Sequence, residues 1–192
     1  MEVVDARPQR GDAARNRRLL LDAARRLIAT RCPEEVSTED IAAAAGVGKG
    51  TLFRRFGSRA GLLAELLDED ERALQQAFMF GPPPLGPHAP PLRRLLAFGR
   101  ERLRFVESHL ALLVQIDRDP QARHNPASEV LHTHVRLLLE AASSTGNLDA
   151  QTDALLALLE ADYVAHQLQG RGRTVEDVSR AWESLARKLC GR

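Results

Sequence analysis

Cationic and hydroxyl side chains gather in the seven residues from Lys49 to Arg55, beside two glycines. An arginine such as Arg54 can bind O6 and N7 of guanine with two hydrogen bonds at once, and lysine and threonine can hold phosphates or bases. Gly50 has no side chain, so another backbone could approach it closely, at some cost in helix stability. These residue types favour recognition of a nucleic acid if one helix face presents them together.

Two short helices must position this face. The stretch STEDIAAAAGVGKGTLFRRFGSR, which begins at Ser37, predicts helices over 38–45 and 49–56. Ser37 is a good N-cap, and Asp40 can complete a capping box three residues later. Gly46 allows the positive φ that ends the first helix. A compact helix-turn-helix with a basic second helix fits the major groove of DNA.

The letters GVGKGT also resemble the phosphate-binding loop of nucleotide-binding enzymes. That loop requires lysine followed directly by serine or threonine, and a strand before it. Here Gly50 follows Lys49 and a helix precedes, which excludes this interpretation. The chain also lacks a nucleophile elbow and a glycine-rich cofactor loop, so the sequence predicts neither an enzyme nor a cofactor.

The remaining sequence predicts an all-α protein, because no segment alternates polar and apolar residues over the length of a strand. Segment 81–91 holds six of the ten prolines and must end the helix before it. It fits either an ordered polyproline-like structure or a mobile linker. We expect a flexible basic arm (1–13), a three-helix unit with a connecting fourth helix (14–80), and a second helical unit (92–192). The other helices are predicted at about Arg15–Thr30, Arg59–Phe80, Pro91–Glu107, Leu110–Arg118, Ala127–Ser143, Asp149–Gly170 and Thr174–Cys190.

The charge is unevenly distributed along the 192 residues. Residues 1–60 carry 12 Lys and Arg against 8 Asp and Glu, a balance of +4, whereas the rest carries −3. A module that binds phosphates needs this positive balance. Hydrophobic residues make up 44%, enough for a core, but no apolar run reaches the roughly 20 residues of a membrane span. The two cysteines, Cys32 and Cys190, favour a reducing cytoplasm.

The segment from Arg17 to Leu67, with its core STEDIAAAAGVGKGTLFRRFGSRAGLLAELL, resembles the DNA-binding domain of the TetR family of bacterial transcriptional regulators. The resemblance implies a helix-turn-helix at about 38–57 and assigns roles by position. Thr38 would contact a phosphate, and Arg59 would hold the DNA backbone. The groove-facing residues would be Lys49, Gly50 and Thr51, with Arg54 and Arg55 reaching bases or phosphates.

Two positions depart from the family pattern. Phe53 stands where the family commonly has a tyrosine whose hydroxyl bonds a phosphate, so this hydrogen bond is absent here. Gly48 replaces a frequent cap serine, which predicts a weaker cap for the second helix of the motif. We still include both residues in the expected DNA-binding surface.

The same resemblance implies a homodimer that binds a palindromic operator, with a small-molecule ligand that releases a repressor from DNA. The alternative is a regulator of the same fold that activates transcription or has no small ligand. The last two long helices would form the dimer interface, with Leu155, Leu159, Trp182, Leu185 and Leu189 as candidates. The residues expected to meet a ligand are Phe105, His109, Gln115, Tyr163 and His166.

Two weaker signals concern the histidines and the N-terminal arginines. His124, His132 and His134 are candidate metal ligands by type. His132 and His134 would lie about 200° apart on a helix and cannot face one ion, so no metal site is expected. Asp162 and His166 are spaced to share an ion but fit a polar pair better. The arginines from Arg7 to Arg18 fit either a solvated tail or an arm that reaches phosphates or the minor groove.

Overall fold

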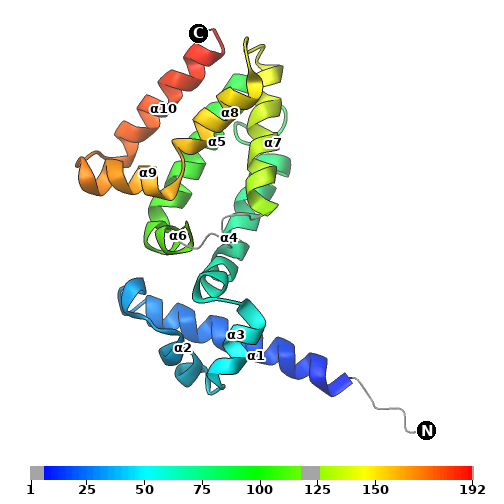
Figure 1. The fold of residues 1–192 in the computed structure, drawn as a ribbon. Coiled ribbons are helices and arrows are strands. Elements are labelled where there is room, and N and C mark those ends of the chain that lie inside the picture. Colours follow the sequence, from blue (N-terminus) through cyan, green and yellow to red (C-terminus); the bar gives the residue numbers. More distant parts are fainter. Residues whose placement is uncertain (1–6, 118–125, 192) are drawn as a thin grey trace. The chain divides into compact units, whose positions relative to one another are not determined.

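The computed structural model describes residues 7–117 and 126–191 of the chain (Figure 1). Within these ranges every regular element is helical and no strand occurs, as the sequence predicts. None of these helices is both long enough and apolar enough to cross a membrane. The chain divides into two compact units, Met1–Leu66 and Leu67–Arg192, hereafter unit 1 and unit 2.

Unit 1 is built from α1 (Arg7–Ile28), the 3-10 turn η1 (Pro33–Glu35), α2 (Thr38–Ala45), α3 (Lys49–Phe56) and the start of α4 (Arg59–Phe80). The bounds of α2, α3 and α4 agree with those predicted. Helix α1 packs mainly against α2. One apolar face of α1 points inward, since Leu20, Ala23 and Ala24 are fully buried. The core of unit 1 therefore fixes α2 and α3 from behind.

Helix α1 begins earlier than predicted. Residues 7–13 of the expected flexible arm are helical, and only residues 1–6 of that arm lie outside the described residues. Pro8 is the second residue of the helix. The N–H groups of the first turn have no acceptor within the helix, so proline costs no hydrogen bond at this position. Proline was therefore a start signal here and not a boundary.

The boundary between the units falls inside α4 and not at the proline-rich segment. Residues 81–90 form a series of tight turns that pack on unit 2, with Leu85 against its core. A Cβ on Gly86 would lie 1.8 Å from the carbonyl oxygen of Gly81, so only glycine fits this turn. Since Phe78 of α4 is also fully buried in that core, both sides of the turn belong to unit 2.

Unit 2 continues with helices that close over one apolar core. These are α5 (Pro91–Ser108), α6 (Leu110–Asp117), α7 (Pro126–Ala141), α8 (Leu148–Ala157), α9 (Ala161–Ala165), the π-helical turn η2 (His166–Gly170) and α10 (Val175–Leu189). Figure 1 shows α10 running along α5 and α8. At this crossing a Cβ on Gly99 would lie 2.2 Å from Cζ3 of Trp182, so the absence of a side chain admits the indole.

The single helix predicted over Asp149–Gly170 is wrong. Helix α8 ends at Ala157, and α9 begins at Ala161 after an extended Glu160. Leu155, Leu159, Ala161 and Val164 are all buried. In one continuous helix, at 100° per residue, Ala161 would point roughly 120° away from Leu155, and Val164 roughly 180° away. The break brings all four to the same core, so tertiary packing overrides good local helix propensity.

Trp182 satisfies a carbonyl that this break releases. In a continuous helix the N–H of Leu159 would bond the carbonyl of Leu155, but it bonds Leu156 instead at 2.8 Å. The indole Nε1–H of Trp182 donates to the Leu155 carbonyl at 2.9 Å. The buried donor and the buried acceptor thus satisfy each other.

This arrangement corrects part of the expected dimer interface. Leu155, Leu159 and Trp182 are at most 3% exposed within the single chain. Their side chains fill the protomer's own core and leave no surface for a partner. The apolar residues of α10 recur on one side of the helix, and that side packs inside the chain. The sequence alone cannot distinguish such a side from a dimer interface. Leu185 and Leu189 are half-buried, so part of each remains open to solvent.

Candidate nucleic-acid interface

The turn between α2 and α3 is set by local chemistry. The Ser37 hydroxyl accepts a hydrogen bond from the Asp40 N–H at 3.1 Å, and the Asp40 carboxylate accepts from the Ser37 N–H at 3.1 Å and from its hydroxyl at 2.7 Å. These bonds lower the pKa of Asp40. Gly46 ends α2 with φ 67°, and its N–H donates to carbonyls of the last turn. The predicted capping box and glycine turn are confirmed.

Helix α3 presents most of the predicted residues together. Leu52 is fully buried against the rest of unit 1. The opposite face exposes Gly48, Lys49, Gly50, Phe53, Arg54 and Arg55, with Thr51 half-buried at its edge. Phe53 is 41% exposed, and the Lys49 ammonium lies 5.7 Å from the centre of its ring. A basic face with one exposed aromatic ring can receive phosphates and base edges.

The start of α3 is open. A Cβ on Gly48 or Gly50 would meet no atom within 4 Å. No side chain caps the helix at Gly48, as the departure from the family pattern predicts. The first N–H groups of α3 therefore point outward without a side-chain acceptor, and such groups favour an anion.

An acidic residue that the sequence did not single out lies beside this face. The Glu39 carboxylate accepts a hydrogen bond from the Lys49 ammonium and another, at 2.9 Å, from the Thr38 hydroxyl. The bond from Lys49, followed by that from Thr38, lowers the pKa of Glu39 to about 2. Glu39 is thus ionised at neutral pH and engages two side chains expected to contact DNA. Only the crossing of α2 and α3 brings these residues together.

Arg59 has protein partners of its own. Its guanidinium donates to the carbonyl of Val36 at 3.0 Å and to that of Pro33. It therefore ties the start of α4 to the segment before α2. Arg17 plays a similar part, since two of its nitrogens donate to the Glu65 carboxylate at 2.9 and 2.7 Å. Arg17 thus links α1 to α4. The sequence predicted either a solvated tail or a DNA-binding arm for the N-terminal arginines, and neither includes this role.

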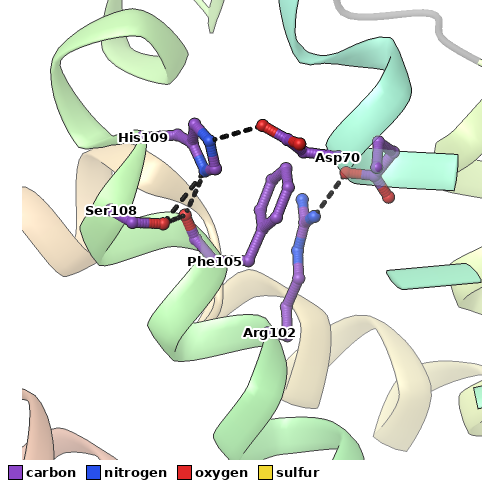
Figure 2. A network of polar contacts seen from close by, with 6 residues as sticks. Asp70, Arg102, Phe105, Ser108 and His109 are labelled. Atoms are coloured by element: carbon purple, nitrogen blue, oxygen red, sulfur yellow. Dashed lines mark hydrogen bonds and ion pairs between the residues drawn. The ribbon is translucent and has the colours of Figure 1, made fainter. Parts of the chain in front are cut away.

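The residues expected to meet a ligand lie in unit 2, and two of them come together. Figure 2 shows His109 between α5 and α4: Nε2 lies 3.1 Å from the Asp70 carboxylate, and Nδ1 lies 2.9 Å from the Phe105 carbonyl. The rings of Phe105 and His109 are 4.6 Å apart. Beside them Arg102 pairs with Glu71 at 2.7 Å. Both polar pairs hold α5 to α4 inside unit 2.

The other three ligand candidates are distributed over neighbouring elements. Gln115 on α6 and Tyr163 on α9 are half-buried, whereas His166 at the start of η2 is exposed. Helix α6 contacts α9, and Tyr163 packs at the edge of the core of unit 2. Among the described residues, no three His, Cys, Asp or Glu side chains gather closely enough to hold a metal ion. His124 lies outside the described residues.

Comparison with known proteins identifies unit 1 most specifically. The profile of the tetR family of bacterial regulatory proteins matches residues 20–66, which span α1 to α4 of unit 1. An HTH-type transcriptional regulator of Mycobacterium tuberculosis is 34% identical over 93 residues, 48% of this chain and 45% of the relative. A TetR-like regulator from a Rhodococcus species is 26% identical, covers 92% of this chain and 97% of its own, and has a TM-score of 0.61. Residues 20–66 therefore form a DNA-binding domain of the TetR family.

The matches differ in how much of each protein they cover. The chain spans about half the length of the curated relatives that it matches. A Thermus thermophilus TetR-family repressor, solved with lauroyl-CoA, has a TM-score of 0.64 over 88% of this chain and 92% of its own, but is 19% identical and shows the fold alone. The specific sequence match to DNA-binding regulators therefore lies in unit 1. Unit 2 shares a TetR-like fold, but its side chains differ from those of the solved structures.

Proposed function

We propose that this TetR-family protein is a transcriptional repressor that binds a palindromic operator as a homodimer and is released by a small molecule. The main support for this proposal is the exposed face of α3, which presents Lys49, Arg54 and Arg55. The capping box at Ser37 and the turn at Gly46 position this helix. The expected contacts remain those of the sequence, with Arg54 and Arg55 at bases or phosphates.

A homodimer follows from the reach of one recognition helix. A single α3 reads only a few base pairs, whereas two related by a twofold axis read two half-sites in successive major grooves. The partly open residues Leu185 and Leu189 of α10 support an interface on the last helices. A DNA partner of this kind also favours the cytoplasm as its location.

A ligand in unit 2 is supported by two buried polar atoms. Thr152 Oγ1 and Gln167 Oε1 are buried without a hydrogen-bond partner among the described residues. Such atoms are costly, and a bound molecule could satisfy them. A structural neighbour of the same fold was solved with lauroyl-CoA. A ligand that binds one dimer geometry better would shift the population away from the DNA-binding one.

Selection from randomised duplex DNA tests the assignment of α3. We expect the wild-type protein to enrich sequences with twofold symmetry. Arg54→Ala should weaken binding to the enriched duplex by about 10- to 100-fold, as loss of a direct base contact does. Arg180→Ala removes a charge from the exposed side of α10 in unit 2 and should leave binding unchanged.

The mass of the protein in solution completes this test. Light scattering should give a dimer for wild type and for both variants. Equal losses of affinity in Arg54→Ala and Arg180→Ala would remove the special role of α3. Enriched sequences without symmetry, together with a monomeric mass, would contradict the dimeric operator complex.

A further inference from the structure

A groove lined by three arginines opens in unit 2, away from the residues expected to meet an effector. It has a volume of about 850 Å³. Its walls come from the proline-rich turns, the first half of α5, the end of α7 with the residues after it, and the end of α10. Figure 1 shows the last turn of α10 and the end of α7 at the same end of unit 2. This volume suits a small organic ligand.

The cationic groups come from two helices. Arg93 and Arg100 lie on α5 and Arg187 on α10, and no acidic side chain is among the described residues that line the groove. Arg100 Nε lies 3.2 Å from the Glu183 carboxylate, and Arg187 Nη2 lies 3.7 Å from it. Arg93 is exposed, and nothing in the described part of the chain forms an ion pair with it. Three guanidinium groups and one carboxylate leave an excess charge of about +2.

The rest of the lining is apolar or backbone-rich. Pro84, Pro90, Leu92 and Leu96 form one wall. Helix α5 begins at this groove, and no side chain caps its start at Pro90. Its first backbone hydrogen bond runs from the Arg94 N–H to the carbonyl of Pro90. The N–H groups of Leu92 and Arg93 precede that first helical bond, so the helix end adds to the positive field of the arginines.

We propose that this groove binds an organic phosphate monoester with an aromatic or apolar body. A phosphate monoester carries about −1.5 to −2 charges at neutral pH, which matches the excess charge. Its three oxygens accept more hydrogen bonds than one carboxylate does, and planar guanidinium groups match them in pairs. The proline and leucine wall receives the apolar body. This site does not include α3, and its binding can be measured without DNA.

Calorimetry with 1-naphthyl phosphate tests the site on the full-length protein. We expect binding that weakens as salt is raised, with little or no heat from 1-naphthol or inorganic phosphate alone. The double variant Arg93→Gln/Arg187→Gln should bind roughly tenfold or more weakly, because two charge-assisted contacts are lost. Arg180→Gln, on the same helix as Arg187 but outside the groove, should bind like wild type.

The single variant Arg93→Gln separates weaker binding from a folding defect, because Arg93 forms no ion pair within the described chain that the substitution could break. It should weaken binding severalfold while Trp182 fluorescence stays unchanged. Equal affinity for naphthol and naphthyl phosphate would overturn the anionic site. So would an affinity unchanged in the double variant, or the absence of any binding heat.

The two cysteines provide a second readout. Cys190 lines the groove, whereas Cys32 is exposed in unit 1 and serves as the internal reference. Saturating 1-naphthyl phosphate should slow alkylation of Cys190 by N-ethylmaleimide and leave Cys32 unaffected, as measured by mass spectrometry. The double variant should need roughly tenfold or more 1-naphthyl phosphate for the same protection. Equal rates at Cys190 with and without the phosphate, or protection by duplex DNA in its place, would overturn the assignment.

Discussion

Units 1 and 2 use their side chains in opposite ways. Unit 1 buries small and aliphatic residues such as Ala23, Ala24 and Leu52, and it leaves its cations outside on α3. Unit 2 buries aromatic rings, with Trp182 among them. The first unit is therefore a rigid support for a surface, and the second is a packed body whose internal contacts could respond to a ligand.

The largest expected effect lies in the core of unit 2. Trp182→Ala removes the indole that fills the space above Gly99 and the donor to the Leu155 carbonyl. Loss of a large buried aromatic side chain costs about 3–5 kcal/mol. Urea unfolding followed by circular dichroism should show this loss, while Leu137→Ala, at a 54% exposed site on α7, should change stability by less than about 0.5 kcal/mol. Similar losses in both variants would contradict the core role of Trp182.

The second effect is a pH dependence specific to unit 2. Burial, and then the charge of Arg94, lower the pKa of His134 to about 4. Its ring lies 4.2 Å from that of Phe78 and 5.3 Å from that of Phe98. Because the folded pKa is below the ordinary 6.5, the unfolded chain binds the proton more readily, and stability falls as pH drops from 6.5 towards 4.

The loss due to His134 should amount to about 1 kcal/mol between pH 7 and pH 5, since the ring is not fully buried and water reduces the effect. His134→Leu should reduce the pH dependence of the unfolding free energy between pH 7 and pH 5, and His132→Gln should leave it unchanged. The carboxylates of Asp40 and Asp177, whose pKa values are lowered, act below this window. An unchanged slope in His134→Leu would assign the dependence to other groups.

The third effect compares the same capping device in the two units. Ser37 with Asp40 caps α2 in unit 1, and Thr174 with Asp177 caps α10 in unit 2. Replacing either N-cap by alanine should cost about 1 kcal/mol. Hydrogen exchange read by mass spectrometry should accelerate in unit 1 for Ser37→Ala and in unit 2 for Thr174→Ala. Acceleration across both units in either variant would show that they unfold as one cooperative body.

The smallest effect concerns Glu39. Glu39→Gln removes a negative charge beside Lys49 and keeps the size of the side chain. Affinity for duplex DNA should rise by about two- to fivefold at low salt, and the gain should shrink as salt is added. Asp22→Asn, also in unit 1 but on α1, is the matched control. Weaker binding by Glu39→Gln would mean that the Glu39 carboxylate orients Lys49 for DNA and does not compete with it.

The sequence predicted best what neighbouring residues decide. Caps and glycine turns act over a few residues, so the bounds of α2 could be derived from Ser37 and Gly46. The exposed face of α3 followed from the same local pattern. Within unit 1, the pairing of Glu39 with Lys49 escaped prediction because it depends on how two helices cross.

Unit 2 was harder to predict because contacts between distant residues decide it. Nothing between Leu155 and Ala161 breaks a helix by composition, yet the shared core requires the break there. An apolar stripe on α10 marks a face that packs, but not whether it packs on its own chain or on another. The three arginines of the groove are up to 94 residues apart, at Arg93 and Arg187, so no local motif announces them.

The position of the unit boundary inside α4 has a consequence for recombining relatives. Leu66 ends unit 1 and Leu67 begins unit 2 within one uninterrupted helix, where no loop tolerates a splice. Inserting one residue there would change the helical phase between Leu66 and Leu67 by about 100°, while Phe78 would stay in the core of its own unit. A chimera that joins this DNA-binding unit to another regulatory unit must therefore keep the helical phase across Leu66–Leu67.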